Sequence, residues 1–500
     1  MRSHLHNATV RPIPLRFRRV SGASAAFPLI LALFTSEFAH AAPPKLSRAA
    51  PSHVGMDVGR LQRIDEVVGE GLRRRRMPGC VVMIGRRGKV VWFKAYGQRR
   101  LQPSKERMTT DTIFDLASLT KPIATATCMM KLVELGRVDL DAPVAKYLPE
   151  FAANGKADIT VKQLLTHQGG LIPDNALRDY NDGYRAAFRK IFALQPYVTP
   201  GSRFVYTDVG FLVLAELTRK LTGKNVHEYS QEIVFRPLGM RETGFLPRQE
   251  LRARAATTQE REGRWMRGEV HDPRAYKLGG IAGHAGLFST CEDLAVYAQM
   301  LLGDGQYGGV RILKRETIRL MSQPVKVSSG LRGLGWDMKT GFSSNRGDLA
   351  TSRAYGHGGF TGTTFWVDPG HDMFVIFLSN RVHPDGKGSV NRLAGRIGTI
   401  AAASILLDSS GRSSSTSAPH KTPVSTGIDV LERDGYRQLR GRKVGLITNH
   451  TGTNRKGVNT AKLLYDSPAV KLVALFSPEH GFHGQLDVAK ISDSKPTPKY

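Results

Sequence analysis

The chain has 500 residues, which is long for a single domain and favours two or three. A hydrophobic content of 41% fits a globular protein, and three cysteines, an odd and low number, argue against a disulfide framework. The formal charge of +29 fits either an anionic cell-envelope polymer or nucleic acid as a partner; without zinc-finger spacing or a basic stripe interleaved with aromatics, we favour the envelope and expect no nucleic acid.

The first residues have the order of a secretory signal. Arg16, Arg18 and Arg19 precede the apolar run AAFPLILALF, and the small residues of AHAA follow it. We therefore expect cleavage after Ala41, so that residues 1–41 are a signal peptide and the mature protein is exported to the periplasm or the extracellular space. The apolar run is too short to cross a bilayer as a helix, and no transmembrane span is expected after cleavage. Sec and Tat export both stay open.

Residues 46–405 have strand patterns near both ends and helical patterns between them. Residues 61–72 have helical apolar spacing, residues 80–97 are typical of two strands around a turn at 87–88, and a second hairpin is expected to turn at 368–370. The stretch between the two hairpins is mostly helical. Strands at both ends with helices between them predict an α/β fold of the α+β type: one antiparallel sheet with flanking helices and an inserted helical subdomain.

A linker and a second region follow. Residues 406–427 are rich in Ser, Thr and Pro, as linkers are. Beyond them, RKVGLITN, NTAKLLYD and VKLVALFSPEHG predict strand, helix and strand, which is the start of an α/β domain with a parallel sheet. Residues 428–500 supply too few elements for a complete domain of this kind.

The stretch TIFDLASLTKPIATAT holds a serine and a lysine three residues apart, Ser118 and Lys121. On a helix capped by Asp115 or by Ser118 itself, the two side chains share one face. Lys121 lies beside an apolar run, so it can be desolvated and take the proton of the serine hydroxyl. The spacing alone is weak, because Ser492 and Lys495 repeat it in a polar tail, where we expect it to be accidental. The alternative is a capping serine and a solvated lysine.

Two further motifs accompany this pair. PGSRFVYTDVG places Tyr206 where a loop meets a helix, with Asp208 two residues on. YGHGGFTGTTFWVDP places His357, Gly358 and Gly359 just before a strand. Glycines at such a position let a backbone N–H approach a substrate carbonyl closely.

The set Ser-x-x-Lys, Tyr-x-Asp and His-x-Gly, in this order, resembles the serine β-lactamase and penicillin-binding-protein superfamily, most closely its class C-related branch. The resemblance covers roughly residues 52–405 and includes LVELGRVDLDAPVAKYLPEF, ITVKQLLTHQGGL and PLGMRETGF. It implies that Ser118 is the acylated nucleophile, that Lys121 is its base partner, and that Tyr206 relays the proton to and from the leaving group.

The resemblance also assigns the rest of the site. His357 stands where the family often has a lysine, and the backbone N–H groups of Ser118 and Phe360, the latter following Gly358 and Gly359, would form the oxyanion hole. Asp208 replaces the usual asparagine. It either keeps Lys121 protonated, which favours Tyr206 as the base, or binds a cationic group of the substrate; the choice of base stays open.

The C-terminal stretches VGLITNHTGTNRKGVNTAKLL and LFSPEHGFHGQLD resemble the start of the bacterial exo-β-N-acetylmuramidase family. The resemblance makes Glu479 the candidate catalytic residue of the second region. Glycoside hydrolysis needs a second acid or base, or help from the substrate, so an incomplete or vestigial module is an equal alternative.

The two resemblances together imply an exported serine hydrolase that acts through an acyl-enzyme on peptidoglycan-derived peptides in cell-wall turnover or recycling. It would be a muropeptide amidase or a D-amino-acid carboxypeptidase, and its partner a muropeptide or another small amide or ester. The alternatives are an esterase or β-lactam hydrolase of small substrates, and a non-catalytic penicillin-binding-type module. No cofactor and no metal site are expected.

Overall fold

The computed structural model describes residues 43–406, 426–448 and 452–476. The contacts divide the chain into two units, one ending at Asp408 and the other beginning at Ser409, and each is described by itself. The expected signal peptide, Glu479 and the pair Ser492–Lys495 lie outside the described residues. Within the described ranges, no helix has the length and apolar character needed to cross a membrane.

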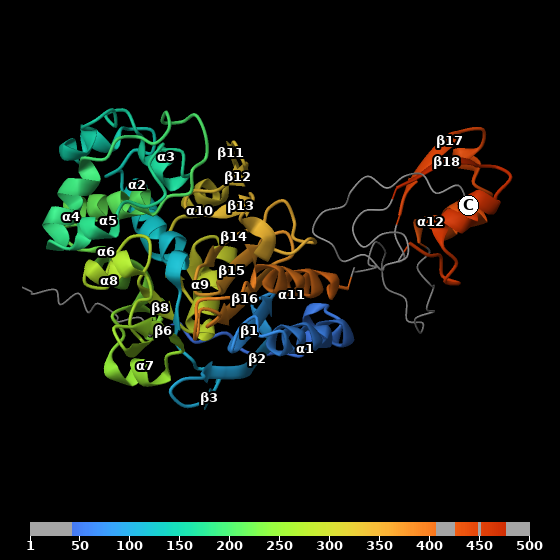
Figure 1. Ribbon diagram of the computed structural model, residues 1–500, viewed down its shortest axis with the longest axis horizontal. Helices are drawn as coiled ribbons and strands as arrows, with labels where there is room; N and C mark the ends of the chain where they lie inside the picture. Colours follow the sequence, from blue (N-terminus) through green and yellow to red (C-terminus); the bar gives the residue numbers. More distant parts are fainter. Residues whose placement is uncertain (1–42, 407–425, 449–451, 477–500) are drawn as a thin grey trace, which may run out of the picture. The chain divides into compact units, whose positions relative to one another are not determined.

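A nine-stranded antiparallel sheet forms the framework of the first unit (Figure 1), with the strand order β11-β12-β13-β14-β15-β16-β1-β2-β3. Its two hairpins turn where the sequence predicts, between β1 and β2 and between β15 and β16. Strand β1 pairs with β16, and Cys80 lies opposite Ser379, so the two ends of the unit meet in the middle of the sheet. This confirms the prediction of one antiparallel sheet closed by distant segments. The strands are β1 (Gly79–Arg86), β2 (Lys89–Arg100), β3 (Glu106–Arg107), β11 (Val325–Val327), β12 (Gly330–Arg332), β13 (Asp337–Lys339), β14 (Tyr355–Gly359), β15 (Thr363–Asp368) and β16 (Met373–Ser379).

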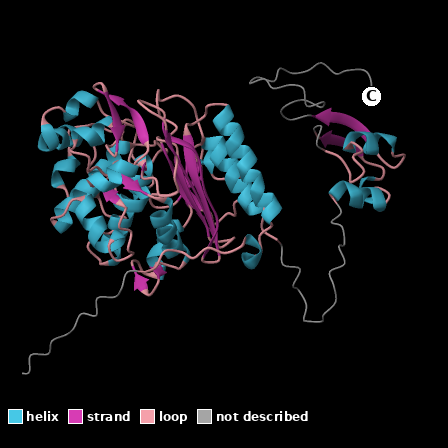
Figure 2. Ribbon diagram, turned by 90° about the horizontal axis from the view of Figure 1, so that it is seen from below, coloured by secondary structure: helices cyan, strands magenta, loops and turns pink. Residues whose placement is uncertain are grey.

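Helices cover both faces of this sheet, as Figure 2 shows. On one face, α1 (Val58–Arg73) and α11 (Asn391–Ala403) pack against Val82 and Ile84 of β1. On the other face, Val81 and Met83 of the same strand join the larger hydrophobic core. Because successive side chains of a strand point to opposite faces and both faces are covered, β1 is buried along its whole length.

The larger core lies between the sheet and the chain segment that connects the two hairpins. The helices in this region confirm the expected helical subdomain beside the sheet, and short strands connect them. The helices are α2 (Thr127–Glu134), α3 (Val161–Leu165), α4 (Gly183–Phe192), α5 (Asp208–Thr222), α6 (Val226–Ser230), α7 (Gln249–Arg254), α8 (Pro273–Lys277), α9 (Cys291–Leu302) and α10 (Arg315–Ser322). The short strands are β4 (Phe114–Asp115), β5 (Gly244–Phe245), β6 (Thr257–Arg261), β7 (Arg264–Arg267), β8 (Leu287–Ser289), β9 (Gln306–Tyr307) and β10 (Val310–Arg311).

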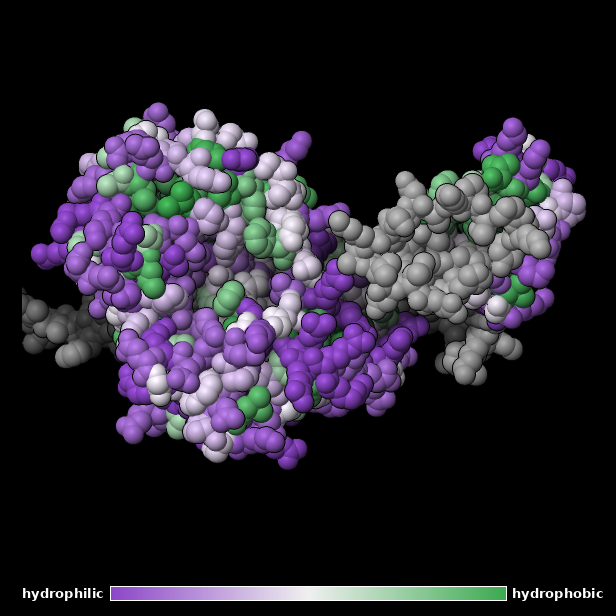
Figure 3. Space-filling view, viewed as in Figure 1, coloured by the Kyte–Doolittle hydropathy of each residue, from purple (hydrophilic) through white to green (hydrophobic). Residues whose placement is uncertain are grey.

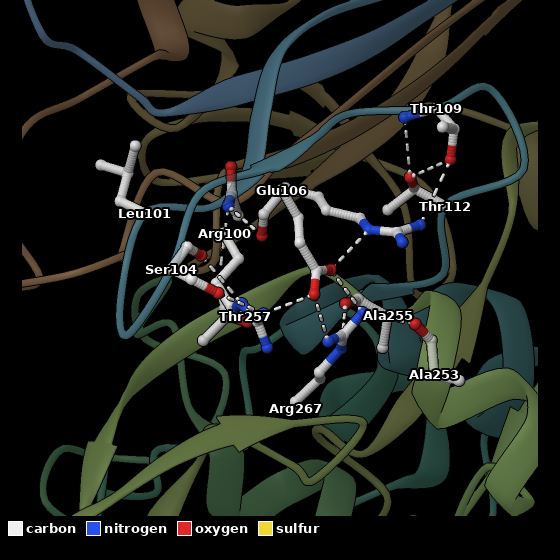
Figure 4. Close-up of polar contacts among 12 residues, drawn as sticks. Arg100, Leu101, Ser104, Glu106, Thr109, Thr112, Ala253, Ala255, Thr257 and Arg267 are labelled. Atoms are coloured by element: carbon white, nitrogen blue, oxygen red, sulfur yellow. Dashed lines mark hydrogen bonds and ion pairs between the residues drawn. The ribbon is translucent and has the colours of Figure 1, made fainter.

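A cluster of charged residues joins the edge of the sheet to this helical region (Figure 4). The carboxylate of Glu106, on β3, accepts a hydrogen bond from Arg99 Nε at 3.0 Å and from Arg267 Nη2, on β7, at 2.7 Å. Arg100 Nη2 lies 2.5 Å from the other carboxylate oxygen. Three guanidinium groups from two distant segments therefore share one carboxylate.

The surface of the first unit is mostly hydrophilic (Figure 3), as expected for a chain with a formal charge of +29. On the face seen in Figure 3, hydrophilic residues predominate and hydrophobic ones are scattered among them. Scattered exposed apolar side chains are ordinary for a globular protein. One of them, Phe360, is 60% exposed and belongs to the candidate site described below.

The second unit contains α12 (Gly427–Arg433), β17 (Lys443–Ile447), α13 (Thr460–Asp466) and β18 (Lys471–Phe476). Strands β17 and β18 pair in parallel, with Lys443 opposite Lys471, and α13 is the crossover between them. This confirms the predicted start of a parallel α/β sheet. Its core among the described residues is small and centres on Tyr436, Leu464 and Val470.

Candidate active site

The segment around Ser118 is held in an unusual backbone conformation. The chain forms a 3₁₀ turn at Ala117–Leu119 and a π-helical turn at Lys121–Ala126 before α2 begins. Ala117 has a φ of +45°, which lies in a backbone region that residues other than glycine rarely adopt. Asp115 Oδ1 accepts the Ala117 N–H at 2.8 Å and so stabilises this conformation. The expected helix cap is therefore wrong: neither Asp115 nor Ser118 caps a regular α-helix here.

Ser118 and Lys121 are in direct contact. Lys121 Nζ donates a hydrogen bond to Ser118 Oγ at 3.0 Å and another to the backbone oxygen of His284 at 3.3 Å. The same ammonium lies 2.6 Å from Asp208 Oδ1, at the start of α5. The side chain of Lys121 is fully buried, so it is not the solvated lysine of the alternative interpretation.

The surroundings of Lys121 favour its charged form. Burial by itself would lower the pKa of the ammonium, but the carboxylate of Asp208 and then the phenol of Tyr206 outweigh burial and raise the pKa above its ordinary value. Lys121 is therefore protonated at neutral pH. In that state it is a hydrogen-bond donor to Ser118 and cannot accept the serine proton unless it first loses its own.

Tyr206 lies next to this ammonium. Its ring centroid is 4.9 Å from Lys121 Nζ and 5.9 Å from the ring centroid of His357 on β14. His167 packs against the same ring at 4.5 Å, and its Nδ1 accepts the N–H of Thr207 at 3.2 Å. The loop before α5 is thereby fixed, and the phenol is placed beside both Lys121 and His357.

His357 is buried and neutral. Burial, with the nearby cations Arg332 and Lys121, lowers its pKa well below the ordinary value. The carbonyl of Gly358 lies 2.7 Å from Nδ1. Because a carbonyl can only accept, Nδ1 carries the proton and Nε2 is left as an acceptor. His357 therefore does not supply the positive charge of the lysine that the family often has at this position.

Strand β14 closely approaches the segment that carries Ser118. A Cβ atom on Gly359 would lie 2.3 Å from the backbone oxygen of Leu116 and 2.2 Å from Thr363 Oγ1, so only glycine fits. The hydroxyls of Thr361 and Thr363 donate to the backbone oxygens of Asp115 and Leu116, at 2.7 and 3.0 Å. These bonds hold the turn after β14 against the segment that carries Ser118.

The two proposed oxyanion donors are unpaired. In the part of the chain that the structure describes, neither the Ser118 nor the Phe360 backbone N–H has a hydrogen-bond acceptor. Two free N–H groups on adjoining segments are what an oxyanion hole requires. Gly358 is also closely packed, since a Cβ atom there would lie 2.5 Å from Asn345 Nδ2.

A second ion pair lies beside the pair formed by Lys121 and Asp208. The sequence did not indicate that this second pair belongs to the site. His284 Nε2 is 2.9 Å from Asp272 Oδ1. Burial opposes ionisation of both partners, but their mutual attraction raises the pKa of His284 and lowers that of Asp272. The motif AGHAGLF predicts a loop-holding histidine, in agreement with this bond. Nothing in it indicates that the backbone of His284 receives the Lys121 ammonium.

These residues also form a group with metal-ligand character. The ligand atoms of Asp208, Asp272 and His284 lie within 4.8 Å of one another. However, the ammonium of Lys121 already lies 2.6 Å from Asp208. The positive charge that such a carboxylate group attracts is supplied by this side chain, so the residues do not fit a resident metal ion.

The fold and the arrangement around Ser118 define a class, the serine hydrolases with a Ser–Lys pair. The family model described as Beta-lactamase matches residues 64–398, and the chain belongs to this family. A second model, described as the N-terminal part of the exo-β-N-acetylmuramidase NamZ, matches residues 444–499.

The chain is similar to proteins with names from peptidoglycan chemistry. It is 32% identical over 380 residues to a "Putative D-alanyl-D-alanine carboxypeptidase" of Escherichia coli K12, covering 68% of this chain and 86% of that protein. It is 30% identical over 362 residues to an N-acetylmuramyl-L-alanine amidase of Bacillus subtilis, covering 65% and 81%. Among solved structures, EstCE1, a hydrolase with promiscuous acyltransferase activity, superposes with a TM-score of 0.57 at 22% identity, covering 69% and 99%; this likeness concerns the fold alone.

Proposed function

We propose that residues 46–405 form an exported serine hydrolase that acts through an acyl-enzyme at Ser118 on peptidoglycan-derived peptides. The contact between Lys121 Nζ and Ser118 Oγ, 3.0 Å long and beside two backbone N–H groups that have no acceptor among the described residues, carries the proposal. The similarity to a muramyl-alanine amidase and to a D-Ala-D-Ala carboxypeptidase supports an amide of peptidoglycan as the substrate. Its role would be cell-wall turnover or recycling.

In the proposed reaction, Ser118 Oγ attacks the carbonyl carbon of the scissile amide while Tyr206 takes the hydroxyl proton. Tyr206 reacts as its phenolate, having first lost its own proton to solvent. The protonated Lys121 stabilises this phenolate, which becomes a neutral phenol when it takes the serine proton. The negative charge that develops on the carbonyl oxygen is bound by the N–H groups of Ser118 and Phe360. The C–N bond then breaks, Tyr206 returns the proton to the leaving amine, and water hydrolyses the ester on Ser118 by the same groups.

The second unit supports a place in the cell envelope. We propose the division 1–41 signal peptide, 46–405 hydrolase, 406–427 linker and 428–500 partial muramidase-like domain, with Glu479 as the candidate acid or base of the last. The match over residues 444–499 to an exo-β-N-acetylmuramidase supports a peptidoglycan substrate for the whole chain. The charge of +29 suits work beside an anionic envelope in the periplasm or outside the cell.

Acylation by a fluorescent penicillin tests the nucleophile. The wild-type protein, Ser118→Ala and the matched control Ser492→Ala are incubated with the probe and analysed by intact-mass spectrometry. We expect one adduct on the wild type and on Ser492→Ala, and none on Ser118→Ala. Equal labelling of all three would contradict the assignment.

The substrate class is tested next with purified muropeptides. Release of L-Ala-linked peptide from muramic acid would identify an amidase, and release of a terminal D-amino acid would identify a carboxypeptidase. If only p-nitrophenyl esters or β-lactams are hydrolysed, the esterase or β-lactamase alternative replaces the peptidoglycan substrate. A protein that forms the penicillin adduct but turns over nothing would be the binding module.

A further inference from the structure

Arg381, two residues after β16, reaches across to the turn that follows β14. Its Nε and Nη2 atoms donate to the backbone oxygen of Phe360 at 2.9 and 2.5 Å. Its Nη1 atom donates to the backbone oxygens of Gly386 and Gly388 at 2.9 and 3.1 Å. The guanidinium also lies over the ring of Phe360, 4.4 Å from its centroid. One side chain thus holds Phe360 by both its backbone and its ring.

The acceptors of this guanidinium are unusual for an arginine. Within the described ranges all of them are backbone carbonyl oxygens, and no carboxylate pairs with Arg381. Such an arrangement contributes little through charge pairing. Its consequence is geometric, because a rigid planar fork fixes the relative positions of the carbonyl groups that it joins.

The turn itself determines where the Phe360 N–H points. The Gly362 N–H donates to the Gly359 oxygen at 3.0 Å, so the Gly359 carbonyl is directed into the turn. The peptide between Gly359 and Phe360 is trans and planar, so its N–H points to the opposite side. The next peptide, which carries the Phe360 oxygen, is held by Arg381. The two peptides that flank Phe360 are therefore both fixed.

The stem of Arg381 is fitted to this turn as well. A Cβ atom on Gly362, whose φ is +98°, would lie 2.4 Å from Arg381 Cγ. On its other side, the turn is tied to the nucleophile segment by the bond from Thr361 to Asp115. The ring of Phe360 is stacked on His271 at 5.6 Å. Ser379 also holds the turn, since its hydroxyl donates to the Gly362 oxygen at 2.7 Å, and Arg381 adds the restraint on the Phe360 oxygen.

We propose that Arg381 is a positioning residue of the oxyanion hole: it holds the peptide groups around Phe360 so that the Phe360 N–H meets the oxyanion formed at Ser118. This inference rests on the proposed function. Deleting an oxyanion donor lowers the rate by about 10²–10³. A donor that is only displaced should cost less of the rate than a donor that is deleted. We therefore expect the rate of acylation to fall by roughly 10- to 100-fold when Arg381 is replaced.

The test measures how fast fluorescent penicillin and a fluorophosphonate label Ser118 in wild type, Arg381→Met, Arg381→Lys and Arg381→Ala. Arg392→Met, on the exposed side of α11, is the matched control. We expect the maximal acylation rate to fall in all three Arg381 variants, with an unchanged half-saturating probe concentration and an unchanged circular dichroism spectrum. Lysine should rescue little, because a single ammonium cannot reproduce the planar fork that joins the Phe360 oxygen to those of Gly386 and Gly388. Free guanidinium ion should restore part of the rate of Arg381→Ala and none of Ser118→Ala.

The outcomes separate the two proposals. If the wild type is labelled at Ser118 and folded Arg381→Met is labelled equally fast, the role of Arg381 is overturned and the proposed function stands. If the half-saturating concentration alone rises, or if guanidinium ion restores nothing, Arg381 has only a structural role and the inference is likewise overturned. If neither probe labels Ser118 in the wild type, the proposed function fails, and the inference fails with it.

Discussion

Two charge clusters of the first unit are built in opposite ways. At the edge of the sheet, one carboxylate, Glu106, is surrounded by three guanidinium groups, and its side chain keeps 24% of its exposure. At the candidate site, one ammonium, Lys121, is completely buried and lies among a carboxylate, a phenol and a hydroxyl. The first arrangement joins two segments of the fold. The second holds a charge 3.0 Å from the hydroxyl of Ser118, and its side-chain partners are groups that can take part in proton transfer.

Burial and the type of partner, and not the number of charges, distinguish the structural cluster at Glu106 from the candidate catalytic cluster at Lys121. Removing either centre leaves charges without a partner. A serine hydroxyl lies within 3.0 Å of a cation in both clusters, Ser104 beside Arg100 and Ser118 beside Lys121, but of these two cations only Lys121 is completely buried. Variants of the two clusters should therefore affect different measurements.

Lys121→Met should have the largest effect. The ammonium that contacts Ser118 and Asp208 is lost while the volume of the side chain is kept. We expect the acylation rate to fall by about 10³ or more, the range that a positioned proton-transfer group contributes. Stopped-flow labelling with fluorescent penicillin measures it, and Lys495→Met, from the repeated Ser-x-x-Lys, is the control. A labelling rate within tenfold of wild type would place the site elsewhere.

Asp208→Asn should have a smaller effect with a distinct pH signature. Asp208 raises the pKa of Lys121, so asparagine should lower that pKa and shift the alkaline limb of the acylation rate toward lower pH. Because a raised lysine pKa stabilises the folded protein at every pH below the ordinary value, Asp208→Asn should also lose stability at neutral pH. Breaking a buried pair predicts about 3 kcal/mol.

The pH profile and urea unfolding of Asp208→Asn test the two parts separately. An alkaline limb that does not move would show that Lys121 does not titrate in the reaction. If the limb moves and activity at neutral pH stays within about tenfold of wild type, the base must be a group other than the charged lysine, and Tyr206 is the group in place. Asp139→Asn, an exposed aspartate, serves as the control.

Local patterns predicted much of this structure. Arg87–Gly88 and Asp368–Pro369–Gly370 are turn-forming sequences, and both hairpins turn there. The pairing of Cys80 with Ser379 could be expected in kind but not in register, because nothing local fixes which residues of distant strands face each other. The conformation of Ala117 was not predicted, although its contact with Asp115 spans only two residues, because an aspartate at this spacing is equally compatible with a helix N-cap and with a turn.

In the candidate site, too, the sequence predicted the local motifs but not the contacts between distant residues. The motifs around Ser118, Tyr206 and His357 carry their chemistry in adjacent residues and were readable. The groups that position these residues are distant in the sequence. The backbone oxygen of His284, which accepts a hydrogen bond from Lys121, is 163 positions away, and Arg381 lies 21 positions from Phe360, whose oxygen it binds. An arginine in LSNR or a histidine in AGHAGLF gives no indication of such a partner.

Glu106→Gln should have the smallest effect on activity and a clear effect on stability. Burial raises the pKa of Glu106, but hydrogen bonds from Arg267 and Arg99 outweigh it and lower the pKa below the ordinary value. A lowered carboxyl pKa stabilises the fold above the unfolded value, near 4.3, and this contribution is lost as the pH falls through the folded value. We expect the glutamine variant to lose about 2 kcal/mol at pH 7, since hydrogen bonds to charged groups contribute on that order.

Urea unfolding at pH 7 and at progressively lower pH measures this loss for wild type, Glu106→Gln and Glu250→Gln, whose carboxylate is 75% exposed. The difference between wild type and Glu106→Gln should shrink as the pH falls below about 4.3, because the wild-type carboxyl then becomes neutral too. Glu250→Gln should stay within about 0.5 kcal/mol throughout. Acylation by penicillin should be unchanged in both. A folded Glu106→Gln that acylates slowly would show that the sheet edge and the candidate site are coupled, and would remove the separation between the two clusters.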